Sequence, residues 1–137
     1  MAQIQCQTIT ISLEHATPEQ FYSVFNPPYP HLRDICSKMG TDIQIAADYF
    51  HATIKVSCPD GETRKIEVEV ISIEPPKKTT TYRAWTANDQ SSEHEIKLEV
   101  TDDRNVKWTV SCPPPADDYL NFLESVSKAV DNYFGQN

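Results

Sequence analysis

The stretch Cys112–Gly135, CPPPADDYLNFLESVSKAVDNYFG, decides the fold of this chain. Consecutive prolines lead directly into the strongest helical pattern of the sequence, in which apolar side chains recur at helical spacing. This apolar stripe consists of Tyr119, Leu123, Val126, Val130 and Tyr133, with Phe122 and Phe134 beside it. We expect the helix to begin within Ala116 to Tyr119, where Asp117 and Asp118 suit the positive end of the helix dipole. A long helix with one apolar face needs a surface to cover.

That surface is predicted to be a curved antiparallel β-sheet. Ile4–Leu13 alternates between apolar and polar residues, as a half-buried strand does. Six further segments have strand patterns: Thr41–Asp48, Ala52–Cys58, Thr63–Glu74, Lys78–Ala87, Ser92–Val100 and Asn105–Cys112. Short turn-rich separators without helices between them indicate antiparallel pairing. Within Thr63–Glu74 the apolar residues change from one parity to the other, which predicts a β-bulge near Val70.

Two short helices are predicted between the first and second strands. Thr17, Pro18 and Gln20 have the spacing of a capping box with proline at the first helical position. Pro27–Pro30 ends this helix, and His31–Gly40 carries the pattern of a second one. The sequence therefore predicts an α+β fold in one domain, residues 1–137. Seven antiparallel strands present a concave face that the helices cover.

Composition excludes several classes of function. A formal net charge of −8 argues against nucleic acid or an anionic membrane as the main partner. No run approaches the roughly 18 apolar residues of a membrane span, and Met1–Gln7 lacks the features of a signal peptide. The four cysteines have no zinc-binding spacing, so we expect a reduced, cytoplasmic protein without a metal. Because no nucleophile elbow, phosphate loop or dinucleotide fingerprint is present, we expect no cofactor.

Two segments carry a resemblance to a known family. The run Ala52–Ala84, ATIKVSCPDGETRKIEVEVISIEPPKKTTTYRA, and the run Asn105–Phe134, NVKWTVSCPPPADDYLNFLESVSKAVDNYF, resemble the plant Bet v I superfamily. Its fold is the START-like helix-grip, and the chain is most similar to the major latex protein branch. Family members often have a glycine-rich loop between the second and third strands. Here that stretch is Ile45–Thr53, IAADYFHAT, without a glycine.

The resemblance implies an internal cavity between sheet and long helix that binds a hydrophobic small molecule. Our first hypothesis is a binding protein for a plant metabolite in defence or specialised metabolism. The second is a cofactor-free cyclase or isomerase acting on an alkaloid or a terpenoid or iridoid precursor in the same pocket. The third is a stress-related protein that acts through protein contacts. We expect a monomer or a weak homodimer.

Inward strand parity and the resemblance together predict the residues that line the cavity. They are Ile54, Val56, Tyr82, Ala84, His94, Ile96, Trp108, Tyr119, Leu123 and Val126. A few polar groups on an otherwise apolar wall fit a ligand site better than a solid core. For His94 the alternative is a strand end that faces water.

If the protein is an enzyme, its candidate proton carriers are His94, Tyr82 and His51. The two histidines are chosen because His titrates nearest neutral pH, and Tyr82 because it is an acid of inward parity. Lys97 and Lys107 have outward parity, which argues against a lysine-based condensing enzyme. Without glycine, the loop Ile45–Thr53 is expected to avoid positive φ angles and not to bind nucleotides. We expect it to aim Tyr49, Phe50 or His51 at the mouth of the cavity.

Overall fold

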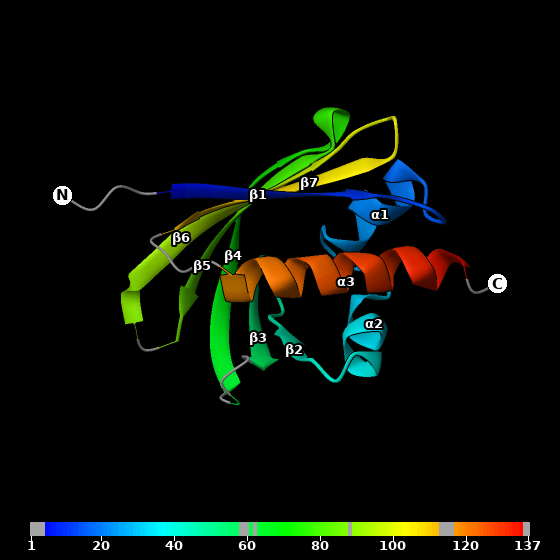
Figure 1. Ribbon diagram of the computed structural model, residues 1–137. Coiled ribbons are helices and arrows are strands. Elements are labelled where there is room, and N and C mark those ends of the chain that lie inside the picture. Colours follow the sequence, from blue (N-terminus) through cyan, green and yellow to red (C-terminus); the bar gives the residue numbers. More distant parts are fainter. Residues whose placement is uncertain (1–4, 58–60, 62, 88, 113–116, 136–137) are drawn as a thin grey trace.

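The computed structural model describes residues 5–57, 61, 63–87, 89–112 and 117–135. In these residues it contains seven strands, three α-helices and one short 3-10 helix (Figure 1). In chain order they are β1 (Gln5–Ser12), α1 (Pro18–Val24), α2 (Leu32–Lys38), β2 (Asp42–Ile45), β3 (His51–Ser57), β4 (Thr63–Glu74), η1 (Pro75–Lys77), β5 (Thr79–Thr86), β6 (Asp89–Val100), β7 (Asn105–Cys112) and α3 (Asp117–Gly135). The predicted order of elements is confirmed, and α3 begins within the expected segment.

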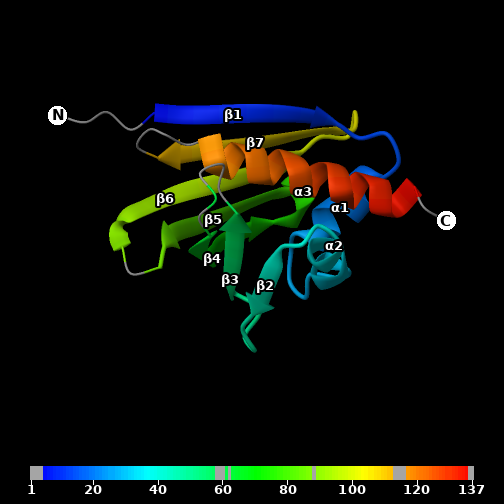
Figure 2. The same cartoon turned by 60° about the horizontal axis from the view of Figure 1, so that its bottom comes forward.

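The strands form one antiparallel sheet in the order β1-β7-β6-β5-β4-β3-β2. The sheet curves strongly, and α3 crosses its concave side, with α1 and α2 at one end (Figures 1 and 2). The α+β helix-grip prediction is therefore confirmed. Because side chains alternate along a strand, every second residue of β6 and β7 points to the concave side, which the helices cover (Figure 1). These residues include Leu98, Val106 and Val110, all fully buried.

Register shifts bend the sheet at two places. One lies between Val70 and Ser72 on β4, where the change of parity predicted a bulge. It leaves Ile71 exposed on the surface. The second lies between Ala84 and Thr86 on β5 and was not predicted, because the sequence there shows no change in apolar parity.

Helix α1 begins with the predicted capping box. The Gln20 backbone N–H donates to Thr17 Oγ1 at 3.1 Å, and the Thr17 backbone N–H donates to Gln20 Oε1 at 2.9 Å. Pro18 occupies the first turn, where its missing N–H costs nothing. The helix then buries Phe21 and Val24 against the sheet.

Replacing Thr17 by alanine is expected to lower the free energy of unfolding by about 1 kcal/mol, because an N-cap side chain satisfies an otherwise unpaired N–H. Thr17→Ser keeps the hydroxyl and is expected to stay within about 0.5 kcal/mol of the wild type. Urea unfolding of the three proteins measures this difference. Equal stability of Thr17→Ala and wild type would show that the cap contributes nothing.

Helix α3 is amphipathic and is tied to the far end of β1 by a buried carboxylate. Asp131 accepts hydrogen bonds from the backbone N–H groups of Glu14, His15 and Ala16 at 2.9, 2.9 and 2.8 Å. These three donors follow β1 directly and lead into α1.

No helix in the part of the chain that the structure describes is long and apolar enough to cross a lipid bilayer.

Candidate functional site: an apolar cavity

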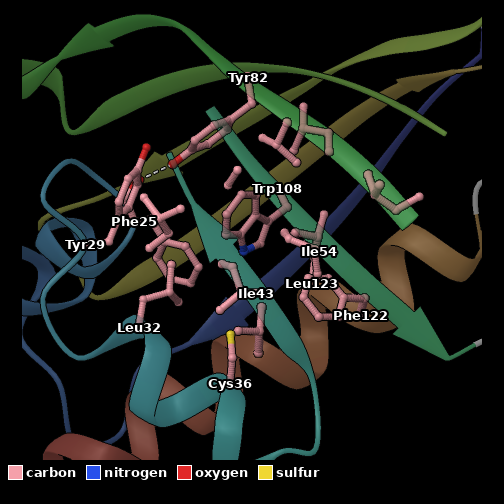
Figure 3. Close-up of a pocket in the computed structure, with 16 residues that line it drawn as sticks. Phe25, Tyr29, Leu32, Cys36, Ile43, Ile54, Tyr82, Trp108, Phe122 and Leu123 are labelled. Carbon is pink, nitrogen blue, oxygen red and sulfur yellow. Dashed lines mark hydrogen bonds between the residues drawn. The ribbon is translucent and has the colours of Figure 1, made fainter. Parts of the chain in front are cut away.

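A cavity of about 100 Å³ lies between the concave face of the sheet and the helices (Figure 3). Its described lining residues come from the α1–α2 region, from six strands and from α3. They are Phe25, Tyr29, Leu32, Cys36, Ile43, Ile45, Ala52, Ile54, Ile66, Val68, Tyr82, Ile96, Trp108, Phe122, Leu123 and Val126. Nearly all of these side chains present only carbon to the space.

Strand alternation positions most of this wall. Each of the three strands β2, β3 and β4 contributes two residues that are two positions apart and therefore lie on the same face of the sheet. These pairs are Ile43 and Ile45, Ala52 and Ile54, and Ile66 and Val68. The cross-strand register places each pair beside the next, because Ile43 lies opposite Ile54 and Ile54 lies opposite Ile66. The short edge strand β2 is therefore the outer wall of the cavity.

Two tyrosine hydroxyls in the wall already have acceptors. Tyr82 donates to the backbone carbonyl of Phe25, which ties the end of α1 to the sheet (Figure 3). Burial raises the pKa of Tyr82 well above 10, with smaller contributions from Tyr29 and Tyr22. Tyr29 donates to the carbonyl of Tyr49 at 2.7 Å.

The remaining polar atoms of the described wall belong to Trp108 and Cys36. Trp108 Nε1–H donates to Ser127 Oγ on α3 at 2.8 Å, and both residues are almost fully buried. Burial raises the pKa of the Cys36 thiol to about 11, so this group is neutral and weakly nucleophilic at pH 7. The polar groups of the wall are thus either paired within the protein or uncharged.

The structure brings together six of the residues predicted to line the cavity: Ile54, Tyr82, Ile96, Trp108, Leu123 and Val126. Ala84 and His94 are buried and lie opposite each other on β5 and β6, but they are not among the lining residues. His94 is therefore not a strand end facing water. The side chains of Val56 and Tyr119 lie outside the described part of the structure.

Sequence reasoning missed the walls that come from β2 and from the α1–α2 region. Ile43 and Ile45 had a usable signal, because they alternate with polar residues in a predicted strand. Leu32 and Cys36 share one face of the predicted second helix. Tyr29, in contrast, lies between prolines, where no periodicity indicates a direction.

His51 lies outside the cavity. Its Nδ1 is 2.9 Å from Asp48 Oδ2, its Nε2 is 2.9 Å from Glu69 Oε2, and its side chain is half exposed. The hydrogen bond to Asp48, followed by that to Glu69, raises the pKa of His51 and favours its charged form. Since both ring nitrogens face carboxylates on the outer side of the sheet, the structure gives His51 no contact with the cavity.

The glycine-free loop between β2 and β3 does adopt a positive φ angle, at Tyr49 with φ 63°. The expectation that it avoids such angles was wrong. Asp48 explains how the turn is held: its Oδ1 accepts from the backbone N–H of Phe50 at 2.9 Å, a local bond that stabilises tight turns. Tyr49 and Phe50 remain about half exposed, at 46% and 48%.

Comparison with solved structures identifies the class of fold. Ginseng major latex-like protein 151 from Panax ginseng matches with a TM-score of 0.77 at 15% identity, covering 96% of this chain and 97% of that one. Ara h 8.0201 matches with a TM-score of 0.68 at 15% identity, covering 98% and 100%. Truncated norcoclaurine synthase from Thalictrum flavum matches with a TM-score of 0.67 at 12% identity, covering 100% and 98%.

These three proteins are of the Bet v I superfamily, so the resemblance inferred from the sequence is confirmed at the level of the fold. The chain has the Bet v I-like helix-grip architecture. Neither a protein-family model nor a curated protein matches the sequence.

Among the described residues, no group of three or more His, Cys, Asp or Glu side chains could hold a metal ion.

Proposed function

We propose that the protein binds a hydrophobic small molecule in the cavity, as part of plant defence or specialised metabolism in the cytoplasm. The observation that supports this most directly is the chemistry of the wall. Its carbon surface favours an apolar ligand, and its hydroxyl and indole groups are already paired within the protein. Binding an apolar molecule there leaves no polar group of the described wall without its partner.

The second candidate is a cofactor-free cyclase or isomerase in the same pocket, and one of the structural neighbours is a synthase by name. Such an enzyme needs a proton donor or acceptor that touches its substrate. Of the candidates His94, Tyr82 and His51, the described lining contains only Tyr82. Its proton is held by the Phe25 carbonyl, and its pKa lies well above 10. This favours binding over catalysis.

Replacing Ala52 by phenylalanine is expected to weaken the binding of Nile red, a neutral apolar dye, about tenfold, which corresponds to about 1.4 kcal/mol. Ala52 is partly exposed and lies in the cavity wall, so the ring can occupy the cavity without compressing the core. Titration of dye fluorescence measures the affinity, and urea unfolding is expected to change by less than about 1.5 kcal/mol.

Ala84→Phe is the matched control, with the same change at a buried site outside the lining. Ala84 is 0% exposed and lies opposite the buried His94. The added ring is therefore expected to overpack the core and to lower the free energy of unfolding by about 3 kcal/mol. If the dye binds Ala52→Phe and the wild type equally well, the dye does not occupy this cavity.

A further inference from the structure

A second hollow, here called the outer groove, lies against the wall of the cavity. Its volume is about 280 Å³, and Tyr29 and Ile45 line both spaces. On its outer side are His31 and Arg33 from the start of the α2 region, Asp34 in the first turn of α2, and Tyr49 from the β2–β3 loop. One tyrosine and one isoleucine therefore separate an apolar space from a polar one.

The outer groove offers hydrogen-bond donors and acceptors together. In the part of the chain that the structure describes, neither Arg33 nor Asp34 forms an ion pair, so the guanidinium and the carboxylate are both available. The ring of His31 is held in place by the hydroxyl of Tyr133, 2.9 Å from Nδ1. Planar polar groups beside an exposed tyrosine ring suit a neutral ligand group that carries several hydroxyls. An anionic group is less suited, because it would lie beside the Asp34 carboxylate.

Tyr29 is a partition between the two spaces, because it lines both of them. The hydroxyl of its side chain donates a hydrogen bond to the Tyr49 carbonyl on the β2–β3 loop, at 2.7 Å. Tyr29, His31 and Tyr49 have φ angles of 57°, 69° and 63°, a backbone region that non-glycine residues seldom adopt. Such conformations are costly for residues with a side chain, and they gather at sites where ligands are held or exchanged.

Size also argues that the two spaces act together. Small-molecule sites commonly have volumes of about 300–1,000 Å³, and the apolar cavity alone is well below this range. With Tyr29 turned aside, the cavity and the outer groove together reach the lower part of the range. A ligand of ordinary size would then have an apolar part in one space and a polar part in the other.

We propose that Tyr29 moves to join the cavity to the outer groove, and that the joined site takes an amphipathic ligand. Its apolar body lies in the cavity, and its neutral, hydroxylated head, such as a sugar, lies between Arg33, Asp34 and Tyr49. The proposal deepens the proposed function and rests on it, since it requires that the cavity bind the apolar part. It names the ligand class as a hydrophobic molecule that carries a sugar-like group.

Three probes with the same eight-carbon chain test the head group: octyl glucoside, octanol and octanoate, each below its micelle-forming concentration. The measured quantity is the concentration of each probe that displaces Nile red from the full chain. Octyl glucoside is expected to do so at about tenfold lower concentration than octanol. The double variant Arg33→Ala/Asp34→Ala is expected to bring octyl glucoside to the affinity of octanol and to leave octanol unchanged. Glu95→Ala/Lys97→Ala, a similar pair of charges on the outer face of the sheet, is the matched control and is expected to change neither.

The outcomes separate this proposal from the proposed function. If the three probes bind equally well, the outer groove takes no part, and cavity binding stands. If octanoate binds best and loses affinity in the double variant, the groove takes anions, and the proposal is overturned. If no probe displaces the dye and the dye itself does not bind, the proposed function fails as well. Tyr29→Phe tests the movement of Tyr29, because it keeps the aromatic ring and removes the hydrogen bond to the Tyr49 carbonyl. The association rate of octyl glucoside, measured by stopped-flow displacement of Nile red, is expected to be several-fold higher than in the wild type. An unchanged rate would contradict a moving Tyr29.

Discussion

Replacing Asp131 by alanine is expected to lower the free energy of unfolding by about 3 kcal/mol, because three backbone N–H groups lose a charged acceptor at once. The donors belong to Glu14, His15 and Ala16, and that of Ala16 is fully buried. Thermal unfolding is expected about 10 °C below that of the wild type. Urea and thermal unfolding at pH 7 measure both quantities.

Asn132→Ala, on the exposed side of the same helix turn, is the matched control and is expected to change stability by less than about 0.5 kcal/mol. The loss of unfolding free energy in Asp131→Asn is expected to lie between those of Asn132→Ala and Asp131→Ala, since the amide has one accepting oxygen and no charge. A loss below about 1 kcal/mol for Asp131→Ala would mean that water replaces the carboxylate.

The same carboxylate makes stability depend on pH. Burial raises the pKa of Asp131, but the hydrogen bonds from Ala16, Glu14 and His15 outweigh it, so the pKa lies below the ordinary value. The stabilisation is therefore present above the unfolded pKa of about 3.9 and is lost as pH falls through the lower folded pKa. Below about pH 4 the stability difference between wild type and Asp131→Ala is expected to shrink.

Replacing Trp108 by alanine is expected to lower the free energy of unfolding by about 4 kcal/mol. Trp108 is almost fully buried and packs edge-on against Phe25, with ring centres 5.2 Å apart. It also stacks on Tyr82, with ring centres 6.5 Å apart. Its loss also leaves the hydroxyl of Ser127 buried without its donor. Chemical unfolding monitored by far-UV circular dichroism measures the effect without relying on tryptophan fluorescence.

A double-mutant cycle isolates the hydrogen bond between Trp108 and Ser127. Trp108→Phe, Ser127→Ala and the double variant are expected to give a coupling of about 1 kcal/mol. Because phenylalanine keeps much of the apolar contact, the cycle separates the bond from the packing. If the two substitutions have additive effects on the free energy of unfolding, the hydrogen bond between Trp108 and Ser127 does not help to hold α3 against the sheet.

The fold could be predicted because its elements have strong local signals. The apolar stripe of Asp117–Gly135, the capping box at Thr17 and the alternation of β6 and β7 each depend on neighbours in sequence. The bulge at Val70 was also predictable, since it reverses the parity of the apolar residues. Family resemblance added how the helix and sheet are placed relative to each other, which periodicity does not determine.

The cavity was harder to predict, because parity assigns a side chain to a face but not to the uncovered part of that face. Ala84 on β5 and His94 on β6 are buried partners, yet they lie beyond the lining, next to the unpredicted register shift between these two strands. Strand parity alone could have excluded His51 from the candidate site residues. Ile54 was assigned inward, and a residue three positions earlier on the same strand faces outward.

The pairing of β1 with β7 affects how the chain acquires its structure during translation. Cys6 and Ser111 are partners although 105 residues separate them, and Asp131 reaches Glu14 across 117 residues. While the ribosome is still making the middle strands, β1 has no neighbour, and the hairpins of β3 to β6 expose an uncovered apolar face. Distant pairings of this kind slow folding and prolong the time in which nascent chains can aggregate. A molecule that filled the concave face before α3 emerged would shorten that exposure.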